Sequence, residues 1–395
     1  MKNALPSIVV EEISNLLPEL TQLRRDLHKY PELSGQEEAT ARYVKAYLQR
    51  HMPARILTRL GATASGTGLA AVYEGSEEGP TLMFRADMDA LPIPEQNHLP
   101  YNSLNKGVSH KCGHDGHMSM VAGLAPLLHR HPPKKGRVVL FMQPAEETGE
   151  GARALVQDPH FRELKPDYIF GLHNLPGYPL GQLVLREGTF CAASKGLRVV
   201  LTGGTAHAAE PERGISPAGA LARLLQVLPA LPDQLPHKEL LLLTLTHAQM
   251  GEPSFGISPG QAVLQATLRA NLEEEMTVLS EAVEAQIRTV AQEFGLRLAL
   301  SYHEVFPVTQ NNAVVSEILS RAAAAAGLSV HHKEEAFRWS EDFGHYNQLA
   351  PSGFFGLGSG TEQLNLHNAS YDFPDALIPY GLKMYWALIN ELMGE

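Results

Sequence analysis

The chain reads Thr-Leu-Met-Phe-Arg-Ala-Asp-Met-Asp at residues 81–89. Its first five residues form a short, mostly apolar run, which predicts a buried strand over 81–85. Asp87 and Asp89 follow where this strand is expected to end. An apolar strand that delivers two carboxylates at its end is typical of a sheet that carries a functional site on one edge.

Two further apolar runs end in the same way. Residues 138–142 lead into Glu146 and Glu147, and residues 168–172 lead directly into His173. In open α/β sheets, ligands bind in the crevice outside the carboxyl ends of the strands. We therefore expect the polar groups that follow all three strands to converge in one cleft.

The rest of the chain places these strands in an α/β domain. Apolar residues recur at three- and four-residue steps over 8–28, and a second helix is expected from about residue 37 to 50. Alternation of such helices with short apolar runs predicts a mostly parallel sheet. The predicted strands cover residues 69–73, 81–85, 138–142, 168–172 and 353–357.

The order of predicted strands and helices changes between about residues 195 and 301. Strands and helices there follow one another in the order expected of a small α+β domain inserted between two parts of the first domain. We expect strands at 197–201, 240–247, 261–269 and 296–302, with helices at 217–231 and 279–294. The predicted division is a catalytic domain of residues 1–191 and 305–395, with an inserted domain of residues 192–304.

Composition narrows the class of protein. The 395 residues are 44% hydrophobic and 19% charged with a net charge of −11, which fits a globular protein and argues against nucleic acid as a partner. No signal peptide and no apolar stretch of membrane-spanning length is evident, so the expected location is the cytoplasm, away from membranes. Cys112 and Cys191 are expected to be reduced, and Cys191 to be a small buried residue.

One short motif lies between the first two strands. Residues 111–117 read Lys-Cys-Gly-His-Asp-Gly-His, ahead of a predicted helix. A thiolate and an imidazole two residues apart can bind one metal ion, and Gly113 between them permits a tight bend. Asp115 and His117 are typical of residues that start a helix or support ligands.

Each of these features also has an ordinary structural explanation. A lone Cys-Gly-His triplet is weak as a motif, and adjacent glutamates often form a solvated turn. His173 can be a hydrogen-bonded structural residue, and His367 within Leu-Asn-Leu-His-Asn is anonymous by itself. Their shared placement at strand ends favours a functional site over coincidence.

Several blocks, taken together, resemble the bacterial and plant N-acyl-amino-acid amidohydrolases, a family that includes hippurate hydrolases and indole-acetyl amino acid hydrolases. This family is related to aminoacylase-1 and zinc carboxypeptidases. The resemblance spans the whole chain in the family's order. The blocks are Leu-Arg-Arg-Asp-Leu-His at 23–28, Pro-Glu-Leu-Ser at 31–34, Arg-Ala-Asp-Met-Asp-Ala-Leu-Pro at 85–92, Cys-Gly-His-Asp-Gly-His at 112–117, Gln-Pro-Ala-Glu-Glu at 143–147, Gly-Leu-His at 171–173 and Ser-Glu-Asp-Phe at 340–343.

The resemblance implies a metal-dependent amidohydrolase that cleaves a small N-acyl amino acid. It assigns Glu146 as general base and two divalent metal ions per subunit, with one shared ligand, Cys112. The implied ligands are Cys112, His114, Glu147, His173 and His367. A thiolate with several imidazoles favours zinc over magnesium or calcium, while manganese, cobalt and nickel also suit this set.

The resemblance also gives the inserted domain a role, as a lid and as the interface of a homodimer. His207 resembles the lid histidine that contacts the substrate carbonyl, often from the partner subunit. Arg269 resembles the lid arginine that binds the substrate carboxylate, a task that suits a bidentate guanidinium. Residues 256–259 depart from the family's usual Asn-Val-Ile-Pro, so the lid's contacts to substrate are expected to differ.

Three alternatives stay open on the sequence. A dipeptidase or metallocarboxypeptidase of the same wider group generally uses an aspartate where this chain has Cys112. A cysteine hydrolase with Cys112 as nucleophile leaves the other potential ligands unexplained. A non-catalytic binding protein has no need of a spare base at Glu146.

Overall fold

The computed structural model describes residues 4–394, and the described chain forms two compact units. The first unit combines the chain up to Phe190 with Thr309–Glu335 and with the chain from Asp342 onward. The second unit consists of Cys191–Val308 and the short segment Ala336–Glu341. The linear sequence pattern does not indicate that this short segment joins the second unit.

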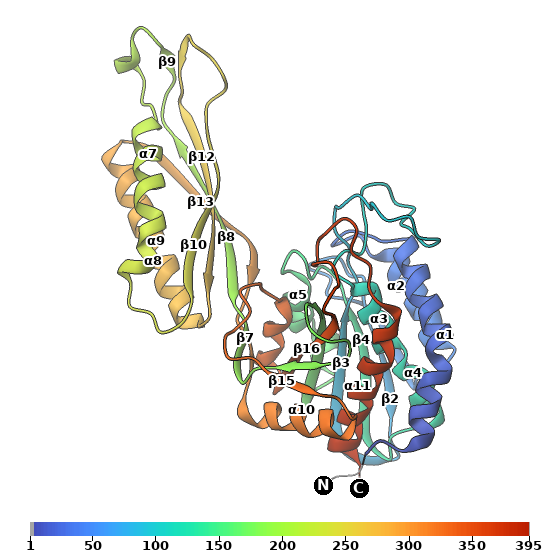
Figure 1. The fold of residues 1–395 in the computed structure, drawn as a ribbon. Helices are drawn as coiled ribbons and strands as arrows, with labels where there is room; N and C mark the ends of the chain where they lie inside the picture. Colours follow the sequence, from blue (N-terminus) through green and yellow to red (C-terminus); the bar gives the residue numbers. More distant parts are fainter. Residues whose placement is uncertain (1–3, 395) are drawn as a thin grey trace. The chain divides into compact units, whose positions relative to one another are not determined.

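The first unit is built on an eight-stranded sheet (Figure 1). Its middle strands β4, β3, β5 and β16 run parallel, and β2 and β1 extend one side in antiparallel pairing. The predicted α/β class with a mostly parallel sheet is confirmed. Across the sheet the strands are β1 (Arg55–Leu60), β2 (Gly68–Glu74), β4 (Lys135–Gln143), β3 (Glu77–Asp87), β5 (Tyr168–Pro176), β16 (Ser352–Gly360), β6 (Leu183–Leu185) and β15 (Val330–His332).

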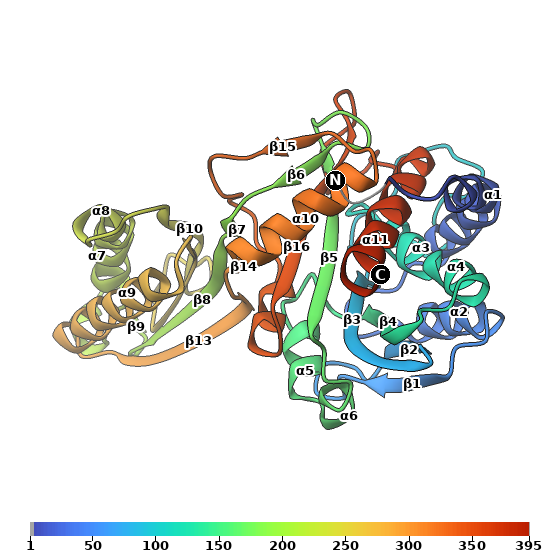
Figure 2. The ribbon, with the colours of Figure 1, turned by 90° about the horizontal axis from the view of Figure 1, so that it is seen from below.

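Helices cover both faces of this sheet. The long helices gather on one face with α3 against β3 and β4, whereas α5 and α6 lie on the other (Figure 2). The helices of the unit are α1 (Ser7–Lys29), α2 (Glu38–Gln49), α3 (His114–Ala122), α4 (Leu124–Arg130), α5 (Gly151–Gln157), α6 (Pro159–Arg162), α10 (Ala313–Ala325) and α11 (Ile378–Met393), with 3-10 turns η3 (Asp342–Gln348) and η4 (Asp375–Leu377). Strands buried on both faces explain why their sequences are continuous apolar runs.

The helix that follows the Cys-Gly-His motif is interrupted. The break lies at Gly123, between α3 and α4, three residues before Pro126. A proline has no N–H for a helical bond to the carbonyl four residues earlier, here that of Ala122, and its ring crowds that carbonyl. A side chain at Gly123 would meet Leu20 at 2.7 Å, so glycine lets the break pack against α1.

The second unit is a four-stranded antiparallel sheet of order β10-β12-β8-β13, with α7 and α9 against it (Figure 1). A separate apolar core lies between these helices and the sheet, as two-layer packing requires. Its elements are β8 (Ala193–Thr202), β9 (Ala206–His207), η1 (Pro211–Arg213), α7 (Ala218–Val227), η2 (Leu228–Ala230), α8 (Leu231–Gln234), β10 (Leu241–Met250), β11 (Ile257–Ser258), β12 (Gln261–Ala270), α9 (Glu273–Glu293) and β13 (Arg297–Phe306). The remaining strands, β7 (Gly188–Cys191) and β14 (Thr309–Asn311), pair with each other.

Cys191 is buried, as predicted, and Cys112 is buried as well. Neither cysteine is in a disulfide within residues 4–394. Among the described residues, no helix has both the length and the apolar character that a membrane span requires.

Arg85 ties β3 to the neighbouring elements of the first unit from a fully buried position. Its guanidinium lies 2.6 Å from Asp87 and 3.1 Å from Asp342, and its Nε donates to Gln143 at 2.9 Å. Removing one partner of a buried ion pair leaves the charges of the other partners buried and uncompensated. We predict that Arg85→Met lowers the free energy of unfolding by about 3–5 kcal/mol, measured by urea denaturation at fixed metal concentration.

The matched control is Arg42→Met. Arg42 lies 3.6 Å from Glu38, and both side chains are more than two-thirds exposed, at 71% and 76%. An exposed pair of this kind contributes only about 0–1 kcal/mol. Equal losses in the two variants would contradict a structural role for the buried arginine.

Candidate active site

The Cys-Gly-His motif forms a sharp bend directly before α3. Gly113 lies in the left-handed region with φ of 92°, and a Cβ at this position would come within 2.6 Å of Asn174 Oδ1. Only glycine meets both conditions without strain. The bend leaves Cys112 outside the helix and makes His114 its first residue, so both side chains turn toward the carboxyl edge of the sheet.

The structure brings all five predicted ligands together within the first unit. The Cys112 sulfur lies 3.4 Å from His173 Nε2, and Glu147 Oε1 lies 3.8 Å from both His114 Nε2 and His367 Nε2. Two groups whose ligand atoms lie within 4.8 Å of one another share the thiol. They are Cys112 with His114 and His173, and Cys112 with Glu147 and His367.

His367 reaches this cluster through an unusual backbone conformation. Its φ of 64° lies in the left-handed region, which is uncommon for a residue other than glycine. Its N–H donates to the carbonyl of Lys111 at 2.8 Å, next to Cys112 in the chain. This bond fixes a distant segment beside the metal motif.

Glu146 lies at the same edge and is nearly buried, with 5% of its surface exposed. Its Oε2 is 3.9 Å from His114 Nε2, close to the position of Glu147. The pair follows β4 after Pro144 and Ala145. Adjacent glutamates thus both contribute carboxylates to the cluster.

Hydrogen bonds to carbonyl oxygens orient the imidazoles. His114 Nδ1 donates to the carbonyl of Asp89 at 2.9 Å, and His173 Nδ1 donates to that of Asn174 at 3.0 Å. Because a carbonyl only accepts, each neutral ring carries its proton on Nδ1 and presents a lone pair on Nε2. Outer contacts of this kind are what fix ligating histidines in metal sites.

Two buried atoms of the cluster are available to a cation. His114 Nε2 and Glu147 Oε1 have no hydrogen-bond partner within residues 4–394. Buried polar groups are normally satisfied, so a lone pair and a carboxylate oxygen left in this state fit a bound cation. The donors present, a thiol, three imidazoles and a carboxylate, are those of transition-metal sites.

The electrostatics of the cluster point the same way. Burial raises the pKa of Cys112, and the charges of Glu147 and Glu146 raise it further. Burial lowers the pKa of His114, yet the charge of Asp87 and the bond to Asp89 outweigh this effect and raise the pKa to about 10. Such surroundings hold excess negative charge, which a divalent cation would balance.

Residues behind the cluster support it through hydrogen bonds that the sequence alone did not predict. Asp87 Oδ1 lies 2.7 Å from His117 Nδ1, and His117 Nε2 lies 2.6 Å from Asn174 Oδ1. Both ring nitrogens of His117 are thereby engaged, so this residue supports the cluster rather than completing it. No pattern singled out Asn174, which is one residue within an apolar strand.

A second buried network holds the first turn of α3. His28 Nδ1 lies 2.8 Å from Asp115, and its Nε2 lies 3.0 Å from Glu95. Lys111, which precedes Cys112, donates from Nζ to the same Glu95 at 2.6 Å. The sequence blocks at 23–28 and 112–117 contain His28, Lys111's neighbour Cys112 and Asp115, but only the fold shows that the two blocks are in contact.

The two predicted lid residues lie in the second unit. His207 is exposed in β9, pairs with Ile257 of β11, and accepts a hydrogen bond from the N–H of Ala209 on Nδ1 at 3.0 Å. Arg269 is half-buried in β12, and its Nη1 donates to the carbonyl of Arg338 and to Ser340 Oγ, both at 2.8 Å. Within the described chain, Arg269 forms no ion pair.

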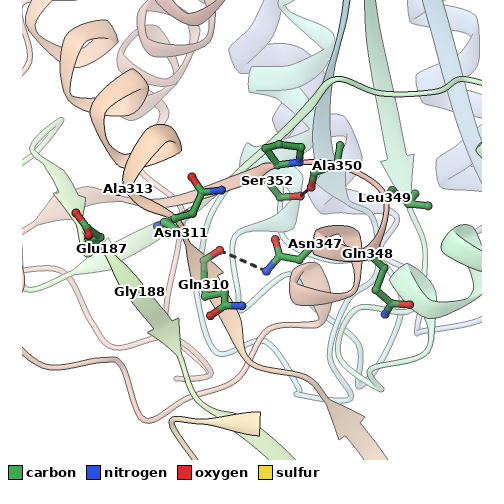
Figure 3. A pocket seen from close by; sticks show the side chains of 12 residues that line it. Glu187, Gly188, Gln310, Asn311, Ala313, Asn347, Gln348, Leu349, Ala350 and Ser352 are labelled. Carbon is green, nitrogen blue, oxygen red and sulfur yellow. Dashed lines mark hydrogen bonds between the residues drawn. The ribbon is translucent and has the colours of Figure 1, made fainter. Parts of the chain in front are cut away.

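A hollow lies at the amino end of β16, away from the cluster at the carboxyl edge of the sheet. It has a volume of about 560 Å³, and Figure 3 shows amide side chains such as Asn311 and Asn347 around it. Its lining holds one carboxylate, Glu187, and neither a thiol nor an imidazole. The metal-binding chemistry therefore belongs to the carboxyl edge.

Comparison with known proteins agrees with this geometry. Residues 83–391 match the sequence model of Peptidase family M20/M25/M40. The chain belongs to this family. The predicted family is thus confirmed, as is the predicted class of enzyme, a metal-dependent amidohydrolase.

Relatives of this M20/M25/M40 chain match it over most of its length. An N-acetylcysteine deacetylase of Bacillus subtilis strain 168 is 32% identical, with 87% of this chain and 89% of the relative covered. A second protein of that strain, an N-acetyl-L-cysteine deacetylase, is 30% identical, with 93% and 86% covered. A dinuclear metal binding peptidase of the M20 family from Bacillus subtilis is 28% identical, with 96% and 99% covered and a TM-score of 0.80.

The network around His28 predicts a pH dependence of stability. Burial lowers the pKa of His28 and Arg24 opposes its charge, but the bonds to Asp115 and Glu95 raise the pKa from 6.5 to about 9. Protonated His28 therefore stabilises the fold fully below pH 6.5, and this contribution is lost as the pH rises through 9. We expect the unfolding free energy of the wild type to fall more steeply over this interval than that of His28→Gln. Parallel curves would contradict the assignment.

Proposed function

We propose that this M20/M25/M40 enzyme hydrolyses the amide bond of a small N-acyl amino acid, releasing a carboxylic acid and a free amino acid. The observation that carries the proposal is the buried cluster of five metal-type donors with a further carboxylate, Glu146, beside it. Two relatives named as deacetylases of N-acetylcysteine support the substrate class.

The proposed cofactor is a pair of divalent metal ions. The dinuclear character of the related peptidase supports two ions, and Cys112 belongs to two of the possible ligand groups, so its sulfur would be a donor to both ions. The thiolate and imidazoles favour zinc, and manganese, cobalt or nickel suit the same donors. When bound, such ions polarise the scissile carbonyl and acidify the attacking water. The proposed ligands are Cys112, His114, Glu147, His173 and His367.

Glu146 is proposed as the general base. Its neighbour Glu147 has an oxygen 3.8 Å from two imidazoles and shares a ligand group with Cys112, whereas Glu146 belongs to neither group that contains Cys112. A carboxylate next to the ligands can take a proton from water and pass it to the leaving amine. A positioned base of this kind contributes about 10² to 10⁴ in rate.

The second unit is proposed to supply contacts to the substrate. Because Nδ1 of His207 accepts the N–H of Ala209, the neutral ring carries its proton on Nε2, where it can donate to the oxygen that gains negative charge. Arg269 is a half-buried cation without an acidic partner in the described chain, which suits a substrate carboxylate. A homodimer formed through this unit, and a cytoplasmic location, stay predictions.

The alternatives have less support. Burial and neighbouring carboxylates raise the pKa of Cys112, the opposite of what activates a nucleophilic cysteine. A dipeptidase or metallocarboxypeptidase would use the same cluster, but the curated relatives quoted above are deacetylases. An assay with both N-acyl amino acids and dipeptides distinguishes these two substrate classes.

The test is hydrolysis of N-acetyl and N-benzoyl amino acids and of dipeptides, with and without a strong chelator. We expect release of free amino acid from the N-acyl substrates, loss of activity with the chelator, and recovery with zinc, manganese or cobalt. Dipeptides as the preferred substrates would replace the proposed function by the peptidase alternative. Activity that survives metal removal but not thiol alkylation would favour the cysteine hydrolase.

Two neighbouring substitutions separate the proposed base from the proposed ligand. Glu146→Gln should keep both metals and lower kcat by about 10² to 10⁴, because a carboxamide cannot take the proton. Glu147→Gln should lower the metal content as well as kcat. Metal analysis and steady-state kinetics decide this, and equal metal loss in both variants would show that the roles are assigned wrongly.

A further inference from the structure

The backbone directly before Glu146 is strained. Ala145 has φ of 50°, in the left-handed region that residues with a side chain rarely occupy. Such conformations persist only where surrounding contacts hold them, and they gather at functional sites. The conformation matters because it sets where the Glu146-Glu147 pair leaves β4.

A buried carboxylate from another part of the chain holds this strained residue. Glu37 is 0% exposed, and its Oε1 accepts the N–H of Ala145 at 2.8 Å and the N–H of Gly35 at 2.9 Å. Its Oε2 accepts the hydroxyl of Thr67 at 3.0 Å. Three hydrogen-bond donors thus hold both carboxylate oxygens of Glu37, and one of these donors is the N–H of Ala145.

The same loop also holds the other side of Glu146. Ser34 Oγ donates to Asp89 Oδ2 at 2.6 Å, and that oxygen accepts the N–H of Glu147 at 2.9 Å. Glu37 directly, and Ser34 through Asp89, therefore restrain the backbone N–H groups of the two residues that flank Glu146. They do so from a loop more than one hundred residues earlier in the sequence.

Capping of the following helix does not explain Glu37. It stands at the start of α2, but its side chain makes no capping bond there. Glu32 has that task, since its carboxylate accepts the N–H of Ala39 at 3.1 Å, and the N–H and hydroxyl of Thr40 at 2.8 and 2.9 Å. The loop thus has one carboxylate for the helix and another for the segment that carries Glu146.

We propose that Glu37 and Ser34 are positioning residues that hold Glu146 and Glu147 in their working geometry. This inference rests on the proposed function for the roles of those two glutamates. Displacing a catalytic group by about 1 Å can cost about 10² in rate, so a weak restraint on this backbone should reduce turnover.

The experiment compares Glu37→Met with Glu32→Met, two carboxylates of one loop that both accept backbone N–H groups. Hydrogen–deuterium exchange of the peptide 143–150 is measured on metal-free and metal-loaded protein, and kcat and KM on metal-saturated protein. We expect Glu37→Met alone to speed exchange in this peptide and to lower kcat by about 10 to 10² with little change in KM. Glu37→Gln, which keeps an oxygen acceptor, should restore most of both.

Ser34→Ala provides a second arm in case Glu37→Met does not fold. It removes only the hydroxyl that fixes Asp89, and it should raise exchange at the same peptide and lower kcat to a smaller extent. Unchanged exchange and kcat in the folded variants, or equal effects of Glu32→Met, would overturn the inference. If the wild type hydrolyses no N-acyl amino acid, the proposed function fails, and the exchange data still decide whether the loop holds the segment.

Discussion

The carboxylates of Asp87 and Asp89 are completely buried at the end of β3, and the candidate site depends on how their charge is balanced. A buried charge is tolerated only when it is paired and hydrogen-bonded. Asp87 is balanced by Arg85 and His117, and Asp89 lies 3.4 Å from His114 Nδ1. The positive and polar groups around these two carboxylates therefore include two imidazoles, that of His114 in the cluster and that of His117 behind it.

Buried charges are also paired further from the cluster, between α1 and α3. Asp115 lies in the first turn of α3, where the positive end of the helix dipole already favours a carboxylate. Arg24 and His28 approach it from α1, at 3.4 and 2.8 Å. These contacts from α1 hold the first turn of α3, which is the turn that carries His114.

Much of the fold could be predicted because β3, β4 and β5 are neighbouring parallel strands with continuous apolar sequences. Their carboxyl ends had to share an edge, which brought Asp87, Glu147 and His173 together. The short strands β6 and β15 and the antiparallel β1 lack that signal, because three residues or a half-exposed pattern give no clear period. His367 came from family resemblance alone, since its position depends on a left-handed backbone and on a bond to Lys111.

Left-handed backbone recurs at three of the segments that deliver the donors. Gly113 separates Cys112 from His114 without strain, whereas Ala145 and His367 adopt φ of 50° and 64° with a side chain present. The neighbouring structure stabilises each strained residue through one backbone N–H, donated to Glu37 in one case and to Lys111 in the other. His114 and His173 come directly from α3 and β5, whereas Glu146, Glu147 and His367 reach them from the strained turns. The hydrogen bonds that fix these turns allow the donors to be positioned before a metal ion binds.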